Sequence, residues 1–450
     1  MMKKLKSTVS INSLALLSLL ALTLHSCKEP QWIVVSPQDY QNGVDHITAI
    51  MVHDIFSPPV ASRIYAYPNI AAHEILAQQD SSLGSLSKSI KHLPPIPKSQ
   101  DPAINYPLAA LIAHMDVSKA LVFSEERVET YRDSLYALWS HQNKSSFNAS
   151  KSYGLAVAQH IKDWMNQDNY SATRTMPKFT VITEDPARWQ PTPPAYMDGI
   201  EPHWNKIRPM IMDSANQFKP IPPPTFSMDP KSDFYKELMD VYQTSKRIEA
   251  IGDSSDEIKM AQFWDCNPYV SVTRGHLMFA TKKITPGAHW IGITKIAANQ
   301  AQLDFNQTVS AYTKTSLAIF DAFISCWDEK YRSNLIRPET VINQYIDESW
   351  KPVLQTPPFP EYSSGHSVVS GASAQILTDI FGPNFSFDDT TEVPFGLPVR
   401  HFDSFEQAAQ EAAISRMYGG IHYKKAIVEG LKQGISVGQL VRDQLNTNHE

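Results

Sequence analysis

Apolar residues recur three and four positions apart over long stretches of this chain, and this spacing constrains the fold more than any other feature. The stretches that show it lie near residues 60–78, 104–122, 150–166, 231–249, 286–329, 366–381, 404–418 and 425–445. The strict alternation that marks half-buried strands is scarce. The sequence therefore predicts an all-α protein made of two packed helical bundles.

Composition narrows the class of protein. With 450 residues, of which 42% are apolar and 10% aromatic, the chain can bury a large core and does not have the composition of a disordered protein. The formal net charge of −6 is not separated into acidic and basic blocks, which argues against a nucleic-acid-binding protein. Three cysteines cannot form a disulfide framework, so Cys266 and Cys326 are expected to be free thiols in the core.

The first 26 residues are typical of a processing signal. Three lysines at positions 3, 4 and 6 precede an apolar run, Leu14–Leu24, that is too short to span a bilayer. The following Cys27 completes a tetrapeptide, LHSC, that resembles the lipobox of bacterial lipoproteins. This resemblance implies that residues 1–26 are removed and that Cys27 carries a lipid, which would anchor an exported protein to a bacterial membrane. The alternative is an ordinary secretory peptide with an incidental cysteine.

The rest of the chain divides into a helical region at 27–250 and a second helical region at 251–450, with Gly252–Asp256 as the best candidate boundary. A proline-rich segment at 185–226 interrupts the first region. Long irregular connections of this kind are usually functional, and this one is expected either to cover a site or to mediate assembly.

The first chemical signal is a helical stripe that changes from apolar residues to cations. The stripe runs from Phe305 to Trp327, and the same face continues to Lys330 and, seven residues further, to Arg337. Seven residues turn an uninterrupted helix by about 700°, which would place the two cations nearly above one another. Pro338 disfavours helical geometry at Arg337 itself. Such a stripe either leaves the core or points at a buried anion.

Two further segments carry groups suited to an anion. In the first, Ser364-Gly365-His366 follows a proline-rich loop and opens a predicted helix, whose N-terminal N–H groups attract oxyanions. In the second, Arg416 continues an apolar helix face, and Gly419-Gly420 can end that helix and bring His422 back beside Arg416. Each segment alone is equally compatible with an ordinary helix end.

Together, Lys330-x6-Arg337-Pro338, Ser364-Gly365-His366 and Ser415-Arg416-x5-His422 resemble the three-part signature of type 2 phosphatidic acid phosphatases and vanadium-dependent haloperoxidases. The resemblance implies a cradle for the equatorial oxygens of phosphate or vanadate, formed by Lys330, Arg337, Ser364, Gly365 and Arg416. It also implies that His422 is the axial ligand of vanadium, or the nucleophile of a phosphatase, and that His366 is a general acid or base.

The chain departs from that signature at two positions. Ser363 stands where phosphatases usually have proline before Ser-Gly-His, and Ala426 stands where an aspartate often follows the last histidine by four residues. Since that aspartate is missing, the group that orients His422 is not identified from the sequence.

Several features favour the haloperoxidases over the phosphatases. Trp327 and Phe359 stand where haloperoxidases place aromatic side chains beside vanadate, and such an apolar wall suits a weakly hydrated halide. The stretches at 56–76 and 263–269 also resemble bacterial vanadium haloperoxidase-like proteins. The expected enzyme binds vanadate and uses hydrogen peroxide, polarised by Lys330, to oxidise a halide, with iodide favoured over bromide. By the same resemblance, Tyr269 and Asp328 are expected near the cradle.

Two other functions stay open at this point. One is an exported acid or lipid phosphatase with a phosphohistidine intermediate at His422, and the other is a non-catalytic, lipid-anchored oxyanion-binding protein. The remaining histidines that we considered show no metal-ligand spacing and are expected in the core or on the surface; they are His53, His73, His114, His160, His276 and His289.

Overall fold

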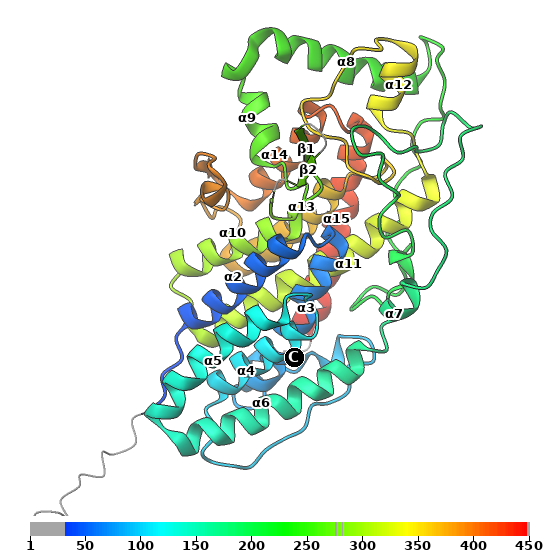
Figure 1. Cartoon of the computed structure of the whole chain (residues 1–450). Helices are drawn as coiled ribbons and strands as arrows, with labels where there is room; N and C mark the ends of the chain where they lie inside the picture. The colour runs from blue at the N-terminus through cyan, green and yellow to red at the C-terminus, as the bar shows by residue number, and fades with distance from the viewer. Residues whose placement is uncertain (1–31, 275–276, 281, 448–450) are drawn as a thin grey trace, which may run out of the picture.

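The computed structural model describes residues 32–274, 277–280 and 282–447 (Figure 1). The signal segment 1–26, Cys27 and His276 lie outside the described residues, so what the sequence predicts for them stays a prediction. Within the described residues, no helix combines the length and the apolar character needed to cross a membrane.

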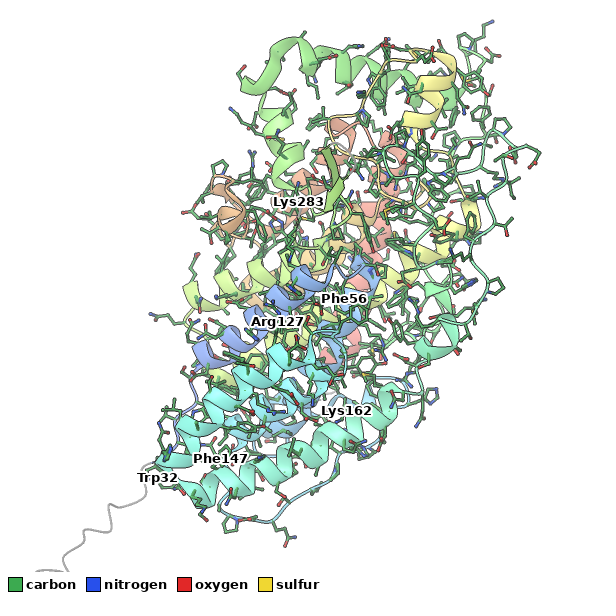
Figure 2. The ribbon with its side chains drawn as sticks, viewed as in Figure 1. Trp32, Phe56, Arg127, Phe147, Lys162 and Lys283 are labelled. Carbon is green, nitrogen blue, oxygen red and sulfur yellow. The ribbon has the colours of Figure 1, made fainter. Side chains whose placement is uncertain are left out.

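The fold is all-α, as predicted, with two groups of helices packed together (Figure 1). The first group consists of α2 (Pro37–Asp54), α3 (Pro58–Leu76), α4 (Tyr106–Lys119), α5 (Glu125–Gln142) and α6 (Lys144–Met165). The second consists of α10 (Pro286–Gln300), α11 (Phe305–Ser333), α13 (Gly365–Phe381), α14 (Phe405–Tyr418) and α15 (Lys424–Asn446). In Figure 2, Phe147 and Lys162 mark the two ends of α6 in the first group.

Further elements of the described residues surround these groups. The remaining α-helices are α7 (Tyr170–Thr173), α8 (Asp233–Ile251), α9 (Asp256–Phe263) and α12 (Pro338–Tyr345). Single 3₁₀ turns are η1 (Ser81–Leu83), η2 (Leu86–Lys88), η3 (Trp204–Lys206), η4 (Gly252–Ser254) and η5 (Val393–Phe395). Two antiparallel pairs complete the described elements, β1 (Ser271–Arg274) with β2 (Leu277–Ala280) and β3 (Phe387–Asp389) with β4 (Arg400–Phe402).

Two helices run through the interior of the molecule. All residues of α3 are buried, and α11 is buried along almost its whole length up to Lys330. A helix that is covered on all sides belongs in the core rather than at a surface. Because α11 packs against α3 of the first group and against α13 and α15 of the second, one hydrophobic core extends through both groups.

The helices α13 and α15 approach each other unusually closely. A Cβ atom at Gly434 of α15 would lie 2.0 Å from the carbonyl oxygen of Val368 on α13, so only glycine fits there. At Gly430, one turn earlier, a Cβ atom would lie 3.0 Å from the carbonyl oxygen of Ser364. The contact therefore fixes the position of the N-terminus of α13.

The predicted helical stretch at 286–329 is two helices, not one. Asp304 caps α11, accepting a hydrogen bond from the N–H of Gln307, and separates it from α10. At its other end α11 stops at Ser333, because Asn334 adopts left-handed geometry (φ 48°). The expectation that Lys330 and Arg337 share one helix face is therefore wrong, since Arg337 is the N-cap residue of α12.

The candidate boundary at Gly252–Asp256 falls between α8 and α9, where η4 joins them directly. In space, α8 packs against α12, α14 and α15, so it accompanies the second group of helices although it belongs to the region 27–250 in sequence.

The proline-rich segment 185–226 crosses the end of α11 and the loop before α13. The N–H of Trp189 donates to the carbonyl of Asn334 at 3.0 Å, and the N–H of Ile200 donates to the carbonyl of Pro358 at 3.1 Å. These contacts hold the segment against the second group of helices, and its two expected roles, covering a site or mediating assembly, stay predictions.

Candidate active site

The C-terminal part of α11, the N-terminus of α13 and the C-terminal end of α14 meet around one cavity. Residues from all three predicted segments line it: Trp327, Phe359, Gly365, His366, Arg416 and His422. Arg337 and Lys330 lie immediately behind this lining, since Arg337 contacts His422 and Lys330 contacts the loop at 360–363. The structure thus brings the predicted groups together although they are up to 95 residues apart in sequence, from Trp327 to His422.

Arg337 enters the site from the start of α12. Its Nε donates to the carbonyl of Phe359 at 2.9 Å and its Nη1 to the carbonyl of Ile421 at 2.8 Å. Its Nη2 is buried and has no hydrogen-bond partner among the described residues. Since a buried donor without a partner costs about 1–3 kcal/mol, this atom is suited to a ligand oxygen.

Arg416 holds the opposite side of the cavity. Its Nη1 donates to the carbonyl of Trp264, while its buried Nε has no partner among the described residues. Burial lowers the pKa of both guanidinium groups, and the pKa of about 10 for Arg337 keeps Arg337 charged at neutral pH. Two buried guanidinium groups with unused donors make a strongly anion-seeking site.

The ammonium group of Lys330 donates hydrogen bonds to the loop before α13. Its Nζ lies 3.1 Å from the carbonyls of Pro360 and Glu361 and 2.5 Å from the carbonyl of Ser363. Burial lowers the Lys330 pKa to about 8. Lys330 therefore contributes positive charge to the site and also fixes the loop, and an oxyanion would compete with a carbonyl for one of its three protons.

The orientation of His422 is determined by two neighbours. Arg337 Nη1, which can only donate, lies 3.2 Å from His422 Nε2, so Nε2 carries a lone pair. The other nitrogen, Nδ1, then carries the proton and donates to Glu361 Oε1 at 2.8 Å. The same oxygen accepts the N–H of Tyr423 at 2.9 Å. Burial holds the pKa of His422 well below its ordinary value, and nearby Arg337 adds to this. His422 is therefore a neutral ligand.

Glu361 is the site residue that the sequence analysis missed. It is fully buried, and burial raises its pKa to about 8, although Arg337 and Lys330 lower it in part. Its role is the one expected of the aspartate that Ala426 replaces, but it comes from the loop before α13. Glu361 follows three prolines in the loop that leads to Ser364-Gly365-His366. A single acidic residue in this apolar loop is the sequence feature that could have predicted its role.

His366 lies in the first turn of α13, partly exposed to the cavity. Arg416 Nη1 is 3.4 Å from its Nε2, and the ring also hydrogen-bonds with the backbone of Trp264. Burial and the charge of Arg416 hold the His366 pKa well below its ordinary value. At neutral pH the imidazole is therefore neutral and can accept a proton.

The start of α13 supplies backbone donors. Ser364 is the N-cap residue, and its side chain accepts a hydrogen bond from the N–H of Ser367. A Cβ atom at Gly365 would lie 3.7 Å or more from any neighbour, so packing does not require glycine there. A side chain at this position would instead occupy space in the cavity that Gly365 lines.

An aromatic wall closes one side of the site. The rings of Trp327 and Phe359 lie 5.0 Å apart, and both line the cavity. Lys330 Nζ and the Arg337 guanidinium each lie 5.0 Å from the centre of the Phe359 ring, and Lys330 Nζ also lies 5.8 Å from the centre of the Trp327 ring. Such cation–π contacts orient the ring and position both charges.

The two residues expected near the cradle by resemblance lie in different places. Tyr269 lines the cavity. Asp328 does not belong to the lining, because its carboxylate accepts from Asn205 Nδ2 at 3.0 Å and from Arg332 Nε at 3.2 Å. Asp328 therefore does not contact the cavity directly, and the expectation that it lies in a second layer around the cradle stays a prediction.

These residues define the class of protein: an all-α protein with a buried, cationic oxyanion site in which two neutral imidazoles face one cavity. The family model of the VCPO second helical-bundle domain matches residues 310–450. A comparison with curated proteins gives no match.

Solved structures extend the likeness over the chain. The crystal structure of the first bacterial vanadium-dependent iodoperoxidase is 62% identical, covers 92% of this chain and 98% of its own, and has a TM-score of 0.89. A bacterial vanadium-dependent chloroperoxidase shares the fold at 18% identity, with TM-scores of 0.65 and 0.64 for its holo and apo forms. The chain belongs to the vanadium-dependent haloperoxidases, and it is an enzyme whose cofactor is vanadate.

The residues present fit that cofactor. The unpaired donors Arg337 Nη2 and Arg416 Nε would meet vanadate oxygens, and His422 Nε2 offers a lone pair to the metal. When bound, vanadate supplies Lewis acidity toward peroxide.

Proposed function

We propose that this enzyme uses hydrogen peroxide to oxidise iodide, and bromide less readily, to the hypohalous acid at the cavity between α11, α13 and α14. The observation that carries the proposal is the set of buried, unpaired guanidinium donors beside the lone pair of His422. The choice of iodide is supported by the 62% identity to an iodoperoxidase, whereas the aromatic wall of Trp327 and Phe359 suits a halide in general.

Each residue has a distinct task in this proposal. Arg337 and Arg416 hold oxygens of the cofactor and neutralise their charge, and Lys330 adds a third positive charge. Glu361 keeps the proton of His422 on Nδ1, so that Nε2 stays available as a ligand. His366, which is neutral, accepts a proton from the incoming peroxide. Trp327 and Phe359 exclude water and leave an apolar surface for a weakly hydrated halide.

The experiment compares two reactions of one preparation. The purified protein is incubated with orthovanadate, and peroxide-dependent oxidation of iodide, bromide and chloride is measured beside the hydrolysis of p-nitrophenyl phosphate. We expect iodide oxidation that depends on vanadate, with much less chloride oxidation and no ester hydrolysis. Chloride oxidation as fast as iodide oxidation would contradict the halide preference. Ester hydrolysis that vanadate inhibits would instead favour a phosphatase.

We further propose that the enzyme is exported and anchored through a lipid on Cys27. The proposal is supported by the lipobox-like LHSC sequence alone. Expression of the full chain in bacteria should place it in the membrane fraction with a mass that includes acyl chains. A Cys27→Ala variant should lose both properties, and an unchanged membrane fraction would contradict the anchor.

A further inference from the structure

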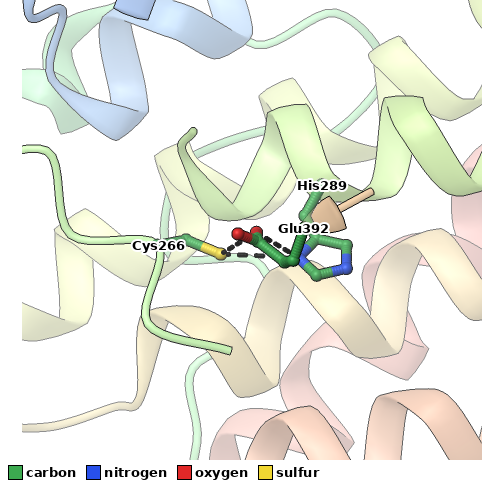
Figure 3. Close-up of side chains that lie close together, drawn as sticks. All are labelled: Cys266, His289 and Glu392. Carbon is green, nitrogen blue, oxygen red and sulfur yellow. Dashed lines mark hydrogen bonds and ion pairs between the residues drawn. The ribbon is translucent and has the colours of Figure 1, made fainter. Parts of the chain in front are cut away.

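Three metal-binding side chains converge next to the vanadate cavity (Figure 3). Cys266 follows α9, His289 belongs to α10, and Glu392 precedes η5, so each comes from a separate segment. All three are buried, with at most 3% of any residue exposed. None of them takes part in the proposed reaction, although Cys266 lines the cavity.

The hydrogen bonds around His289 fix the position of its proton. Nε2 lies 2.8 Å from Asp389 Oδ2 and 2.7 Å from Thr391 Oγ1. The hydroxyl proton of Thr391 is directed at Asp389 Oδ1, at 2.7 Å, so the Thr391 oxygen also accepts. Since Nε2 faces two acceptors, it carries a proton, and Nδ1, which faces Cys266 and Glu392, is the nitrogen that could bind a metal ion in place of a second proton.

The ligand atoms are spaced as they are around a metal ion. Nδ1 lies 3.5 Å from Cys266 Sγ and 3.3 Å from Glu392 Oε1, and Sγ lies 3.9 Å from Oε1. Without a metal ion, the two contacts of sulfur are weak hydrogen bonds and the contact of Nδ1 with Glu392 is an ion pair. Metal–ligand bonds of about 2.0–2.3 Å in tetrahedral geometry separate neighbouring ligands by roughly 3.3–3.7 Å. A positive charge between Nδ1 and the Glu392 carboxylate is therefore needed, and either a proton on Nδ1 or a metal ion can supply it.

We propose that Cys266, His289 and Glu392 bind a zinc ion. Thiolate, imidazole and carboxylate are the ligands that Zn²⁺ takes, and three protein ligands leave the fourth tetrahedral position to water. Asp389 supplies the carboxylate that commonly holds a zinc-bound histidine by its second nitrogen.

The zinc ion would stabilise one wall of the vanadate site. The Trp264 ring stacks on His289 at 4.3 Å, and the carbonyl of Trp264 accepts from Arg416. Asp265, next to Cys266, forms an ion pair with Lys283, which Figure 2 labels just ahead of α10. Zinc would join these segments into one rigid support for Arg416. This role depends on the proposed function, but binding of zinc does not.

The test is the zinc content of the full chain, purified without vanadate, exposed to excess Zn²⁺ and dialysed. Mass spectrometry of the metal should find about one zinc per chain. Cys266→Ser and Glu392→Ala should lose it, and Asp389→Asn should weaken zinc binding about tenfold or more. Cys326→Ala is the matched control, because Cys326 is also a buried free thiol but lies away from the cluster.

A second readout identifies the ligand sulfur. Cobalt(II) in place of zinc should give a thiolate charge-transfer absorption in the wild type and in Cys326→Ala, and none in Cys266→Ser. Circular dichroism checks that each variant is folded. A folded wild type that retains neither metal, or a Cys266→Ser variant that retains zinc as well as the wild type, would overturn the proposal. In that case the three groups share a proton.

Discussion

At the scale of single residues, the site depends on atoms that the protein itself leaves unpaired. Among the described residues, Arg337 Nη2 and Arg416 Nε have no hydrogen-bond partner, and both lie near the His422 ring. Each is buried, so each is costly without a ligand. The energetic cost of this arrangement is recovered only when an oxyanion binds.

Glu361 controls the tautomer of His422, so removal of the Glu361 carboxylate should lower the affinity for vanadate. We expect Glu361→Ala to bind vanadate about 10–100 times more weakly, because Nδ1 loses its acceptor. Glu361→Gln keeps an acceptor oxygen and should recover most of the affinity. Glu329→Gln is the control, since Glu329 is also buried but pairs with Arg332 outside the cavity. Equal affinities for all three variants would show that Glu361 does not orient His422.

Lys330 should give oxyanion binding a characteristic pH dependence. Its pKa is lowered to about 8, so it is charged below that pH and loses its charge as the pH rises through it. A bound oxyanion favours the charged form and moves this loss to higher pH. Vanadate affinity measured from pH 6 to 10 should therefore fall above about pH 8 more steeply in the wild type than in Lys330→Gln. Parallel curves for the two proteins would refute this role.

The sequence was sufficient to predict which residues gather around the cavity, but not which groups hold them in place. The residues at 330, 337, 364–366, 416 and 422 form a recognisable pattern of types and spacings. Glu361 and His422 lie 61 residues apart, and only the loop between α12 and α13 brings them together. Likewise, Cys266, His289 and Glu392 have no motif spacing, because three separate segments supply one ligand each.

At the scale of elements, the break after α11 and the close contact of α13 with α15 build the site. The sequence predicted the long amphipathic helices well, since their burial follows the apolar spacing. It did not predict α2 and α5. In α5 only Val128 and Trp139 are buried, so the apolar pattern is weak, and α2 buries Gln41 and Gly43 among its apolar positions. The left-handed Asn334 that moves Arg337 out of the α11 face was not predicted either.

The glycine contact between α13 and α15 should be intolerant of any side chain. Gly434→Ala would place a methyl group 2.0 Å from the Val368 carbonyl, and overpacking of this kind costs roughly 1–3 kcal/mol. We expect urea unfolding to show that loss of stability, together with weaker vanadate binding, because the start of α13 must move. Gln439→Ala, on an exposed position of the same helix, should change neither property. A Gly434→Ala variant as stable as the wild type would contradict the packing described.

At the scale of the whole molecule, the two groups of helices share α11 and one hydrophobic core. They should therefore unfold together, in a single thermal transition. Vanadate at 100 times its Kd adds about 2.7 kcal/mol of stability, which for 450 residues raises the Tm by about 3 °C. Differential scanning calorimetry with and without vanadate measures both quantities. Two separate transitions, with only one moved by vanadate, would mean that the groups are independent domains.

The claim on which the account rests is that His422 and the buried arginines together hold one vanadate. Isothermal titration of the full chain with orthovanadate tests it most directly. We predict one site per chain and a large loss of affinity in His422→Ala and in Arg416→Ala. His401→Ala should bind vanadate as tightly as the wild type, because the His401 imidazole is exposed on β4. Binding that is the same in all four proteins, or that does not saturate at one vanadate per chain, would contradict the account.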